Sequence, residues 1–300
     1  MTTNRFQSVD YLRGLVMVLM AIDHVRVYSG VPAWSPEVDI FFTRWITHFC
    51  APAFAFFAGT SAYFYGAKVG KSELTKFLLS RGLLLVILEL TVIRFLWSFH
   101  LGTDFILAGV IWMLGWCMIL LTLFIRLDSR TIGVIGVCII LGQQLFGYVP
   151  SLLPDSWQPA FAPVWEFIYP SGFETFKGIN ILYVIIPWLG IMAAGYGFGN
   201  ILQSPDDSRR KYCLTIGVSL FAAYLVIASV LVMNSEPNDF PQILRVLNQN
   251  KYPASILFTM MTLGPIIALV PFAEKAKGWV SNSLITIGRV AFFYYLAHIV

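Results

Sequence analysis

Three ionisable residues interrupt the first long hydrophobic segment, residues 11–29, close to its far end. Asp23, His24 and Arg26 lie within four positions of an otherwise apolar stretch. A charged side chain at membrane depth costs roughly 2.5–3.5 kcal/mol on insertion scales, so such a group normally faces a partner, a polar cavity or a pathway. Histidine is the side chain best suited to move protons near neutral pH. The cluster therefore predicts a site that transfers protons or binds a polar molecule.

A second pair of ionisable residues lies at the entrance to the next hydrophobic segment, residues 48–67. Arg44 and His48 stand at its start, and small residues continue the helical face of His48. Small residues let helices approach closely in lipid, so we expect this face to pack against the first helix and to bring His48 near His24. A lone histidine could equally well hydrogen bond a carbonyl at a helix end, whereas two on facing helices favour function. The small residues are Pro52, Gly59 and Gly66.

Helical geometry divides the ionisable residues around the first segment into two groups. At 100° per residue, Asp10, Arg13 and His24 fall on one face roughly 100° wide. Asp10 and His24 are 14 residues apart, which is about 21 Å along a helix. One face thus joins a polar cluster at the amino-terminal end to a histidine near the other end. Asp23 and Arg26 point elsewhere and are predicted to orient neighbouring helices or to hold a substrate.

The composition is that of a membrane protein. Apolar residues make up 58% of the 300 positions and charged residues only 12%, about half the charged fraction of soluble domains. We therefore predict an all-α, polytopic transmembrane helical bundle that forms a single domain over residues 1–300. The net charge of +4 is spread over loops, so we expect no nucleic-acid partner. The four cysteines show no metal-ligand spacing, and we predict no metal site.

About nine segments approach the 20 apolar residues that cross a bilayer. The last ends at Val300 without a polar flank, which leaves open that the natural chain continues with further helices. The predicted spans lie near residues 11–29, 48–67, 77–98, 104–125, 131–149, 179–202, 213–233, 253–273 and 284–300.

The basic residues predict the orientation of the chain. Thirteen of the 20 Lys and Arg residues fall in one alternating set of loops, the set that contains the amino terminus. Because basic loops stay in the cytoplasm, we predict a multi-pass protein of the bacterial inner membrane with a cytoplasmic amino terminus. With this topology all four histidines lie toward the outer side, which points to chemistry or proton handling at the outer leaflet. They are His24, His48, His100 and His298.

Two further features sit inside predicted spans. Glu89 and Arg94 are five residues apart, so they do not stack on one helical face and each needs a partner from another helix. We favour structural pairing for Glu89 over a proton path. The glycines at 195, 197 and 199 could expose backbone N–H groups to a phosphate, and close helix packing, which we favour, explains them as well.

Several segments together resemble the integral-membrane acyltransferases related to heparan-alpha-glucosaminide N-acetyltransferase, mainly the bacterial proteins of uncharacterised function in that group. The resemblance is firm over residues 5–65, moderate near 183–199 and only hydropathic elsewhere. The motifs that carry it are Arg5–Gly14, Met20–His24, Arg44–Gly59 and Pro187–Gly190.

The resemblance implies that acetyl-CoA binds from the cytoplasm and that the acetyl group reaches a sugar or similar acceptor at the opposite face with the help of a histidine. One departure concerns that histidine. The sugar-acetylating relatives carry it in the loop between helices one and two, whereas residues 30–40 contain none. His24 aligns with an asparagine of the eukaryotic enzymes and His48 with an aspartate. The catalytic residue therefore does not carry over directly, and the acceptor stays open.

Our leading hypothesis is a membrane-embedded acyltransferase that uses acetyl-CoA or another acyl-CoA as donor substrate and holds no permanently bound cofactor. His24 or His48 would act as general base, with a sugar or glycan as acceptor and the lipid bilayer as surroundings. The rival hypothesis is a proton-coupled transporter or export partner for a lipid or sugar, with Asp23, His24, Glu89 and Arg94 as its relay. In the first hypothesis the remaining roles are donor binding by Arg13 and Asp10, and substrate binding by Asp23, Arg26, Arg44 and Arg94.

Overall fold

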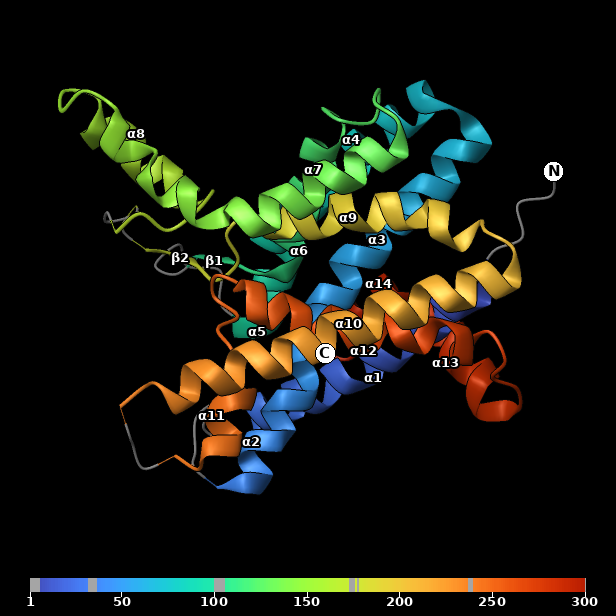
Figure 1. The fold of residues 1–300 in the computed structure, drawn as a ribbon. Helices are drawn as coiled ribbons and strands as arrows, with labels where there is room; N and C mark the ends of the chain where they lie inside the picture. The colour runs from blue at the N-terminus through green and yellow to red at the C-terminus, as the bar shows by residue number, and fades with distance from the viewer. Residues whose placement is uncertain are drawn as a thin grey trace. The chain divides into compact units, whose positions relative to one another are not determined.

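The computed structural model shows a helical chain (Figure 1). It describes residues 6–31, 37–99, 106–172, 176, 178–236 and 240–299. Two residues used in the sequence predictions, Arg5 and His100, lie outside the described residues.

The chain packs as two compact units, each built mainly of helices. The first unit holds residues 1–54, 201–251 and 255–300, and the second holds residues 55–200 and 252–254. The prediction of one domain over residues 1–300 stays a prediction. The first unit contains α1 (Gln7–Tyr28), α2 (Val38–Trp45), the 3-10 helix η1 (Ile46–Phe49), α10 (Asp206–Met233), α11 (Gln242–Leu247), α12 (Ile256–Ala273), α13 (Trp279–Arg289) and α14 (Ala291–Ala297).

The second unit contains most of α3, which begins in the first unit, and nearly all of α9. Its elements are α3 (Cys50–Val69), α4 (Lys71–Leu88), the π-helix η2 (Glu89–Ile93), α5 (Arg94–Ser98), β1 (Ile106–Ala108), α6 (Val110–Leu121), α7 (Ser129–Gly142), the 3-10 helices η3 (Gln143–Tyr148) and η4 (Pro150–Leu152), α8 (Gln158–Trp165), β2 (Ile179–Ile181) and α9 (Trp188–Leu202).

In the first unit, α1 packs against α12, α13 and α14. The contact with α13 depends on two glycines. A Cβ atom on Gly14 would lie 1.8 Å from the carbonyl oxygen of Leu284, and one on Gly288 would lie 1.9 Å from that of Asp10. Only glycine permits this approach, which is the way helices associate closely in lipid. The glycines thereby set the position of α13 on the amino-terminal half of α1.

In the second unit, glycines join α3 to α9. A Cβ atom on Gly59 would lie 1.9 Å from the carbonyl oxygen of Met192, and one on Gly195 would lie 1.9 Å from that of Phe56. The Thr60 hydroxyl donates a hydrogen bond of 2.8 Å to the Gly195 carbonyl across this contact. The prediction that Gly59 packs against the first helix is therefore wrong, because the backbone of α9 occupies that face.

The glycine-rich stretch of α9 packs as we favoured from the sequence. Gly197 lies against Gly133, and Gly199 lies against the ring of Tyr63. In the same way, Gly66 of α3 lies against the side chain of Leu74. Together with Gly195, these contacts confirm that close packing accounts for the alternating glycines.

Two short strands depart from the all-α prediction. Strands β1 and β2 pair in parallel, with Ile106 opposite Ile179 and Ala108 opposite Ile181. The predicted span 179–202 accordingly begins as a strand, and helix α9 starts only at Trp188. Pro187 explains the late start, because the residue before a proline is kept out of the helical region.

The last predicted span is helical but broken. Helix α13 begins at Trp279, earlier than predicted, and ends at Arg289. Val290 has φ −112° and ψ 30°, so it interrupts the helix before α14. The segment therefore forms two helices, and His298 follows the second of them.

Within the described residues, four helical stretches are long and apolar enough to cross a membrane. The predicted helical membrane architecture is confirmed to that extent, and the count of nine spans stays a prediction. Helix α1 is not among the four, since its 22 residues include Asp10, Arg13, Asp23 and Arg26. The four stretches are Val38–Val69, Ser129–Tyr148, Asp206–Met233 and Ile256–Ala273.

The contact between α3 and α9 yields a prediction about stability. Gly195→Ala should destabilise the protein by about 1–3 kcal/mol, the usual cost of overpacking, because the added Cβ meets backbone. Thermal unfolding in detergent measures the change. Gly142→Ala is the matched control, since its Cβ would meet only a Leu145 methyl group at 3.9 Å. Equal stability of the two variants would contradict the packing described.

Candidate functional site

A pair of histidine rings lies near the carboxyl end of α1. Nδ1 of His24 is 2.5 Å from Nε2 of His298, which follows α14. The two rings are nearly parallel, with centroids 4.7 Å apart and planes 13° apart, so that the two nitrogens meet edge to edge. Nδ1 of His298 is in turn 3.0 Å from the carbonyl oxygen of Tyr294. Helix α14 thus brings a second imidazole directly to His24, where the sequence predicted His48 as the companion.

Asp23 and Arg26 pair with each other on the neighbouring face of α1. Nε and NH2 of Arg26 donate to one Asp23 oxygen at 3.2 and 3.0 Å. NH1 of Arg26 donates to the carbonyl of Val31 at 3.0 Å. The side chains are only 9% and 22% exposed for Arg26 and Asp23. The two opposite charges stabilise each other, and the predicted substrate contacts of both residues stay predictions.

His48 is buried beside α12. His48 is part of η1, which contacts both α1 and α12. Its ring centroid lies 5.4 Å from that of Phe258 on α12. The residue is 6% exposed, and Nδ1 has no hydrogen-bond partner among the residues that the structure describes. Nearby, the Cys50 thiol donates to the Val16 carbonyl at 3.1 Å and ties the start of α3 to α1. A buried ring nitrogen without a partner is uncommon and calls for a polar group to pair with it.

Two cations act on both imidazoles. Lys251 and Arg26 each interact electrostatically with His24 and with His48. Arg44, a predicted substrate-binding residue, interacts with His48 in the same way. The two histidines therefore share two cationic neighbours in the first unit, and the Asp23 carboxylate acts on His24 as well.

Sequence reasoning missed two members of this group. The sequence patterns do not single out Lys251, and they place His298 toward the outer side without linking it to His24. Their places in the sequence could have indicated that they lie near His24. Lys251 comes just before the predicted span 253–273, and His298 lies near the end of the predicted span 284–300. Both residues, like His24, are predicted to lie toward the outer side of the membrane. Neither is close to His24 in sequence.

At the other end of α1, Asp10 and Arg13 have different surroundings. Asp10 is 2% exposed, and one of its oxygens lies 3.6 Å from Nε of Arg289 on α13. Arg13 is half-buried. Donor binding by either residue stays a prediction, and the contact with Arg289 gives Asp10 a structural role as well.

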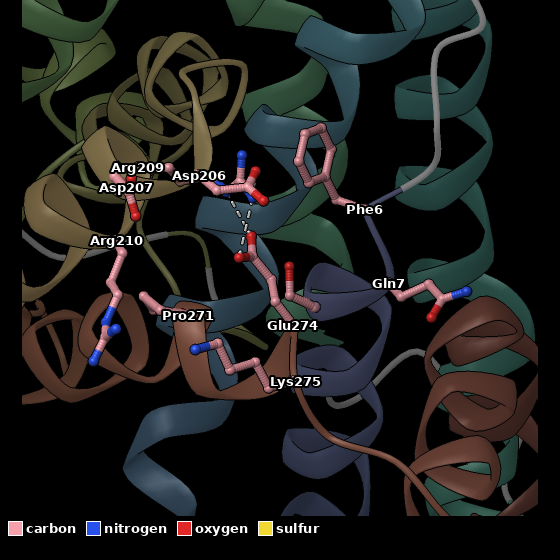
Figure 2. A pocket seen from close by; sticks show the side chains of 10 residues that line it. Phe6, Gln7, Asp206, Asp207, Arg209, Arg210, Pro271, Glu274 and Lys275 are labelled. Atoms are coloured by element: carbon pink, nitrogen blue, oxygen red, sulfur yellow. Dashed lines mark hydrogen bonds and ion pairs between the residues drawn. The ribbon is translucent and has the colours of Figure 1, made fainter.

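A pocket of about 680 Å³ opens beside the first turn of α1 (Figure 2). Arg209 is already engaged there: it donates to Glu274 and to Asp206 at 2.7 Å each, and its guanidinium lies 5.6 Å from the Phe6 ring centre. Figure 2 shows this guanidinium facing the Glu274 carboxylate. The pocket is lined by Phe6, Gln7, Ser8, Asp206, Asp207, Arg209, Arg210, Pro271, Glu274 and Lys275.

Several polar groups of this pocket remain available among the described residues, the Asp207 carboxylate and the Gln7 amide included. Within the described part of the chain, Arg210 and Lys275 make no side-chain hydrogen bond or ion pair. The Ser8 hydroxyl, on a residue only 1% exposed, has no partner among the described residues either. Two cations and a buried hydroxyl beside an aromatic ring are suited to a ligand with both phosphates and a flat ring.

Arg94 and Glu89 belong to the second unit. The Glu89 carboxylate, 3% exposed, accepts hydrogen bonds from the backbone N–H groups of Ile111 and Trp112 at 3.1 and 3.2 Å. It thereby caps the start of α6, where the helix dipole favours a negative charge. The structural role that we favoured for Glu89 is confirmed. The substrate contact predicted for Arg94 stays a prediction.

These observations define a helical membrane protein with an imidazole pair near one end of α1 and a pocket beside the other end. Residues 5–232 match the family described as heparan-alpha-glucosaminide N-acetyltransferase, catalytic. The chain belongs to this family, as its resemblance indicated. The comparison with curated proteins gives no match. His24 and His48 lie within the matched residues, and Lys251, Lys275 and His298 lie beyond them.

The contact between Asp10 and Arg289 can be tested by a double-mutant cycle. Asp10→Asn and Arg289→Gln should each lower the free energy of unfolding. The double variant should lose less unfolding free energy than the sum of the two single losses. Because Arg289 is half-exposed, we expect a coupling of about 1 kcal/mol, measured by thermal unfolding in detergent. Strictly additive effects would show that the two side chains do not interact.

Proposed function

We propose that this protein is a membrane-embedded acyltransferase that moves an acyl group, in the first instance acetyl, from acyl-CoA to a hydroxyl or amine of a sugar or other acceptor. Family membership supports the reaction class. The observation that carries the proposal is the contact between the rings of His24 and His298, because it holds an imidazole in a fixed orientation in a part-buried site. A fixed imidazole is what general-base catalysis requires.

His24 acts as the general base in this proposal. It removes the proton from the acceptor O–H or N–H while that oxygen or nitrogen attacks the thioester carbonyl carbon. The carbon–sulfur bond then breaks, and the CoA thiolate leaves and takes up a proton. General-base help of this kind contributes typically 10²- to 10⁴-fold to the rate.

His48 positions the acceptor. Its buried Nδ1 needs a polar partner, and an acceptor hydroxyl bound beside it would supply one. Lys251, Arg26 and Arg44 surround the two histidines with positive charge. Such charge stabilises the oxyanion that forms as the acceptor attacks the thioester.

The donor enters at the amino-terminal end of α1, which the charge distribution predicts to be cytoplasmic. The pocket beside Phe6 has the volume of a small-molecule site, and Arg210 and Lys275 would hold the CoA phosphates. Arg13 lies further along α1 toward His24. The 16 residues from Ser8 at the pocket to His24 cover about 24 Å along the helix, which the extended pantetheine arm with its acyl group would have to bridge within the first unit.

Two members of the relay in the rival transporter hypothesis have structural partners. The Glu89 carboxylate is engaged by backbone N–H groups at the start of α6, and Asp23 is engaged by Arg26. Uptake into vesicles driven by a pH gradient without any acyl donor would favour the transporter. Hydrolysis of labelled acetyl-CoA by the purified protein, or transfer from it, would favour the enzyme.

The two histidines are the first residues to change. His24→Ala should reduce acyl transfer by about 10²-fold or more, because it removes the general base, and His48→Ala should reduce it through loss of acceptor positioning. Transfer of label from acetyl-CoA measures activity, and expression with thermal unfolding reports folding. Full activity of the double variant would overturn the proposal.

The donor pocket makes a separate prediction. The double variant Arg210→Ala and Lys275→Ala should raise the KM for acetyl-CoA about tenfold or more and leave kcat nearly unchanged, because it removes phosphate contacts. The matched control is Lys211→Ala with Lys277→Ala, which removes the same charge from nearby exposed positions outside the pocket lining. An equal rise in KM for both double variants would indicate a general charge effect and contradict the assigned subsite.

A further inference from the structure

His298 has no role in the reaction described so far, yet its ring contacts that of His24 directly. It lies beyond the residues matched to the family. Its two ring nitrogens face different groups: Nε2 faces His24 Nδ1 at 2.5 Å, and Nδ1 faces the Tyr294 carbonyl at 3.0 Å. The two contacts together determine where the protons of both rings lie.

The carbonyl oxygen of Tyr294 only accepts hydrogen bonds, so Nδ1 of His298 carries a proton and donates it. A neutral imidazole has a single N–H, and Nε2 of His298 is therefore an acceptor. It follows that Nδ1 of His24 carries a proton and donates it to His298. The lone pair of the His24 ring is then on Nε2, the nitrogen that can accept a proton from a substrate.

A doubly protonated His298 would reverse this assignment, because its Nε2 would donate to His24 and move the His24 proton to Nε2. Asp23, Arg26 and Lys251 are among the charged residues that act on His24. Two of the three are cations, and the carboxylate is paired with Arg26. The tautomer assignment above therefore applies to the pair of neutral rings, in which neither imidazole carries a second proton.

The surrounding aromatic rings fix the orientation of His298. Tyr294 stacks on it with centroids 5.7 Å apart, and Tyr295 meets it edge-on at 5.6 Å. Tyr295 also meets His24 edge-on at 6.2 Å. The Tyr28 hydroxyl donates to the carbonyl of Ile299 at 3.3 Å and fastens the end of this segment to α1.

We propose that His298 is a positioning residue that holds His24 in one orientation and in the Nδ1–H tautomer, with Nε2 directed to the acceptor. The catalytic consequence rests on the proposed acyltransferase function. The tautomer itself does not, because it can be observed in the protein without any reaction. The arrangement follows the principle by which a second residue sets the tautomer of a catalytic histidine.

The direct test is nitrogen NMR of the full chain labelled with ¹⁵N-histidine in detergent at a pH where the rings are neutral. His24→Gln identifies the His24 signals by their loss. We expect wild-type His24 to be protonated at Nδ1, His298→Gln to keep that tautomer because its side-chain oxygen accepts in place of Nε2, and His298→Leu to lose it. A wild-type His24 protonated at Nε2, or an unchanged tautomer in His298→Leu, would overturn the proposal.

The kinetic test uses the same variants. His298→Leu should lower kcat for acyl transfer by about 10- to 100-fold, the usual effect of losing a supporting residue, with the KM for acetyl-CoA unchanged. His298→Gln should recover most of that loss. Phe293→Ala, an exposed change in the same helix, is the control and should keep normal kcat.

The two proposals fail in distinguishable ways. Wild-type protein that shows the expected tautomer but transfers no acyl group would overturn the acyltransferase function and leave the tautomer assignment standing. Active wild-type protein in which His298→Leu has normal kcat would overturn the positioning role and leave the function standing.

Discussion

The need to neutralise charge within helix α1 governs the arrangement of the first unit. An unpaired charge at membrane depth is costly, and this helix carries four charged residues and a histidine. Asp23 and Arg26 pair on the helix itself, whereas Asp10 meets Arg289 from α13. The contacts of α1 with its neighbours follow from this requirement as much as from apolar packing.

The broken segment α13–α14 meets this requirement at both ends of α1. Arg289 closes α13 beside Asp10, and His298 follows α14 beside His24. The interruption at Val290 lets one segment cross the amino-terminal half of α1 tightly, through Gly14 and Gly288, and then run on to the histidine. A site proposed from motifs near the amino terminus is therefore completed by residues at the far end of the sequence.

Local patterns predicted much of this structure. The apolar runs indicated a helical membrane architecture, and among the described residues four helical stretches are long and apolar enough to cross a membrane. The helical phase of α3 predicted that Gly59 lies on a closely packed face but assigned that face to the wrong neighbour. The period of a helix does not say which other helix packs against a given face. The strand before α9 was missed because an apolar run of that length is compatible with either structure.

The members of the candidate site were predictable only where they share a helix or a motif. His24 and His48 stood out as ionisable residues in apolar surroundings. Lys251 and His298 are distant in sequence, so their proximity to His24 depends on tertiary packing that no local spacing encodes. The hydrogen bond between His298 and the Tyr294 carbonyl, which determines the tautomer, depends likewise on the ring orientation within α14.

The central claim is that donor and acceptor chemistry meet along α1, and a structure of the protein with a non-hydrolysable acetyl-CoA analogue tests it most directly. We predict density for the nucleotide in the pocket of Arg210 and Lys275, with the acyl end directed along α1 to Nε2 of His24. Density that enters from the His24 end, or an acyl carbonyl bound away from His24 and His48, would contradict the account.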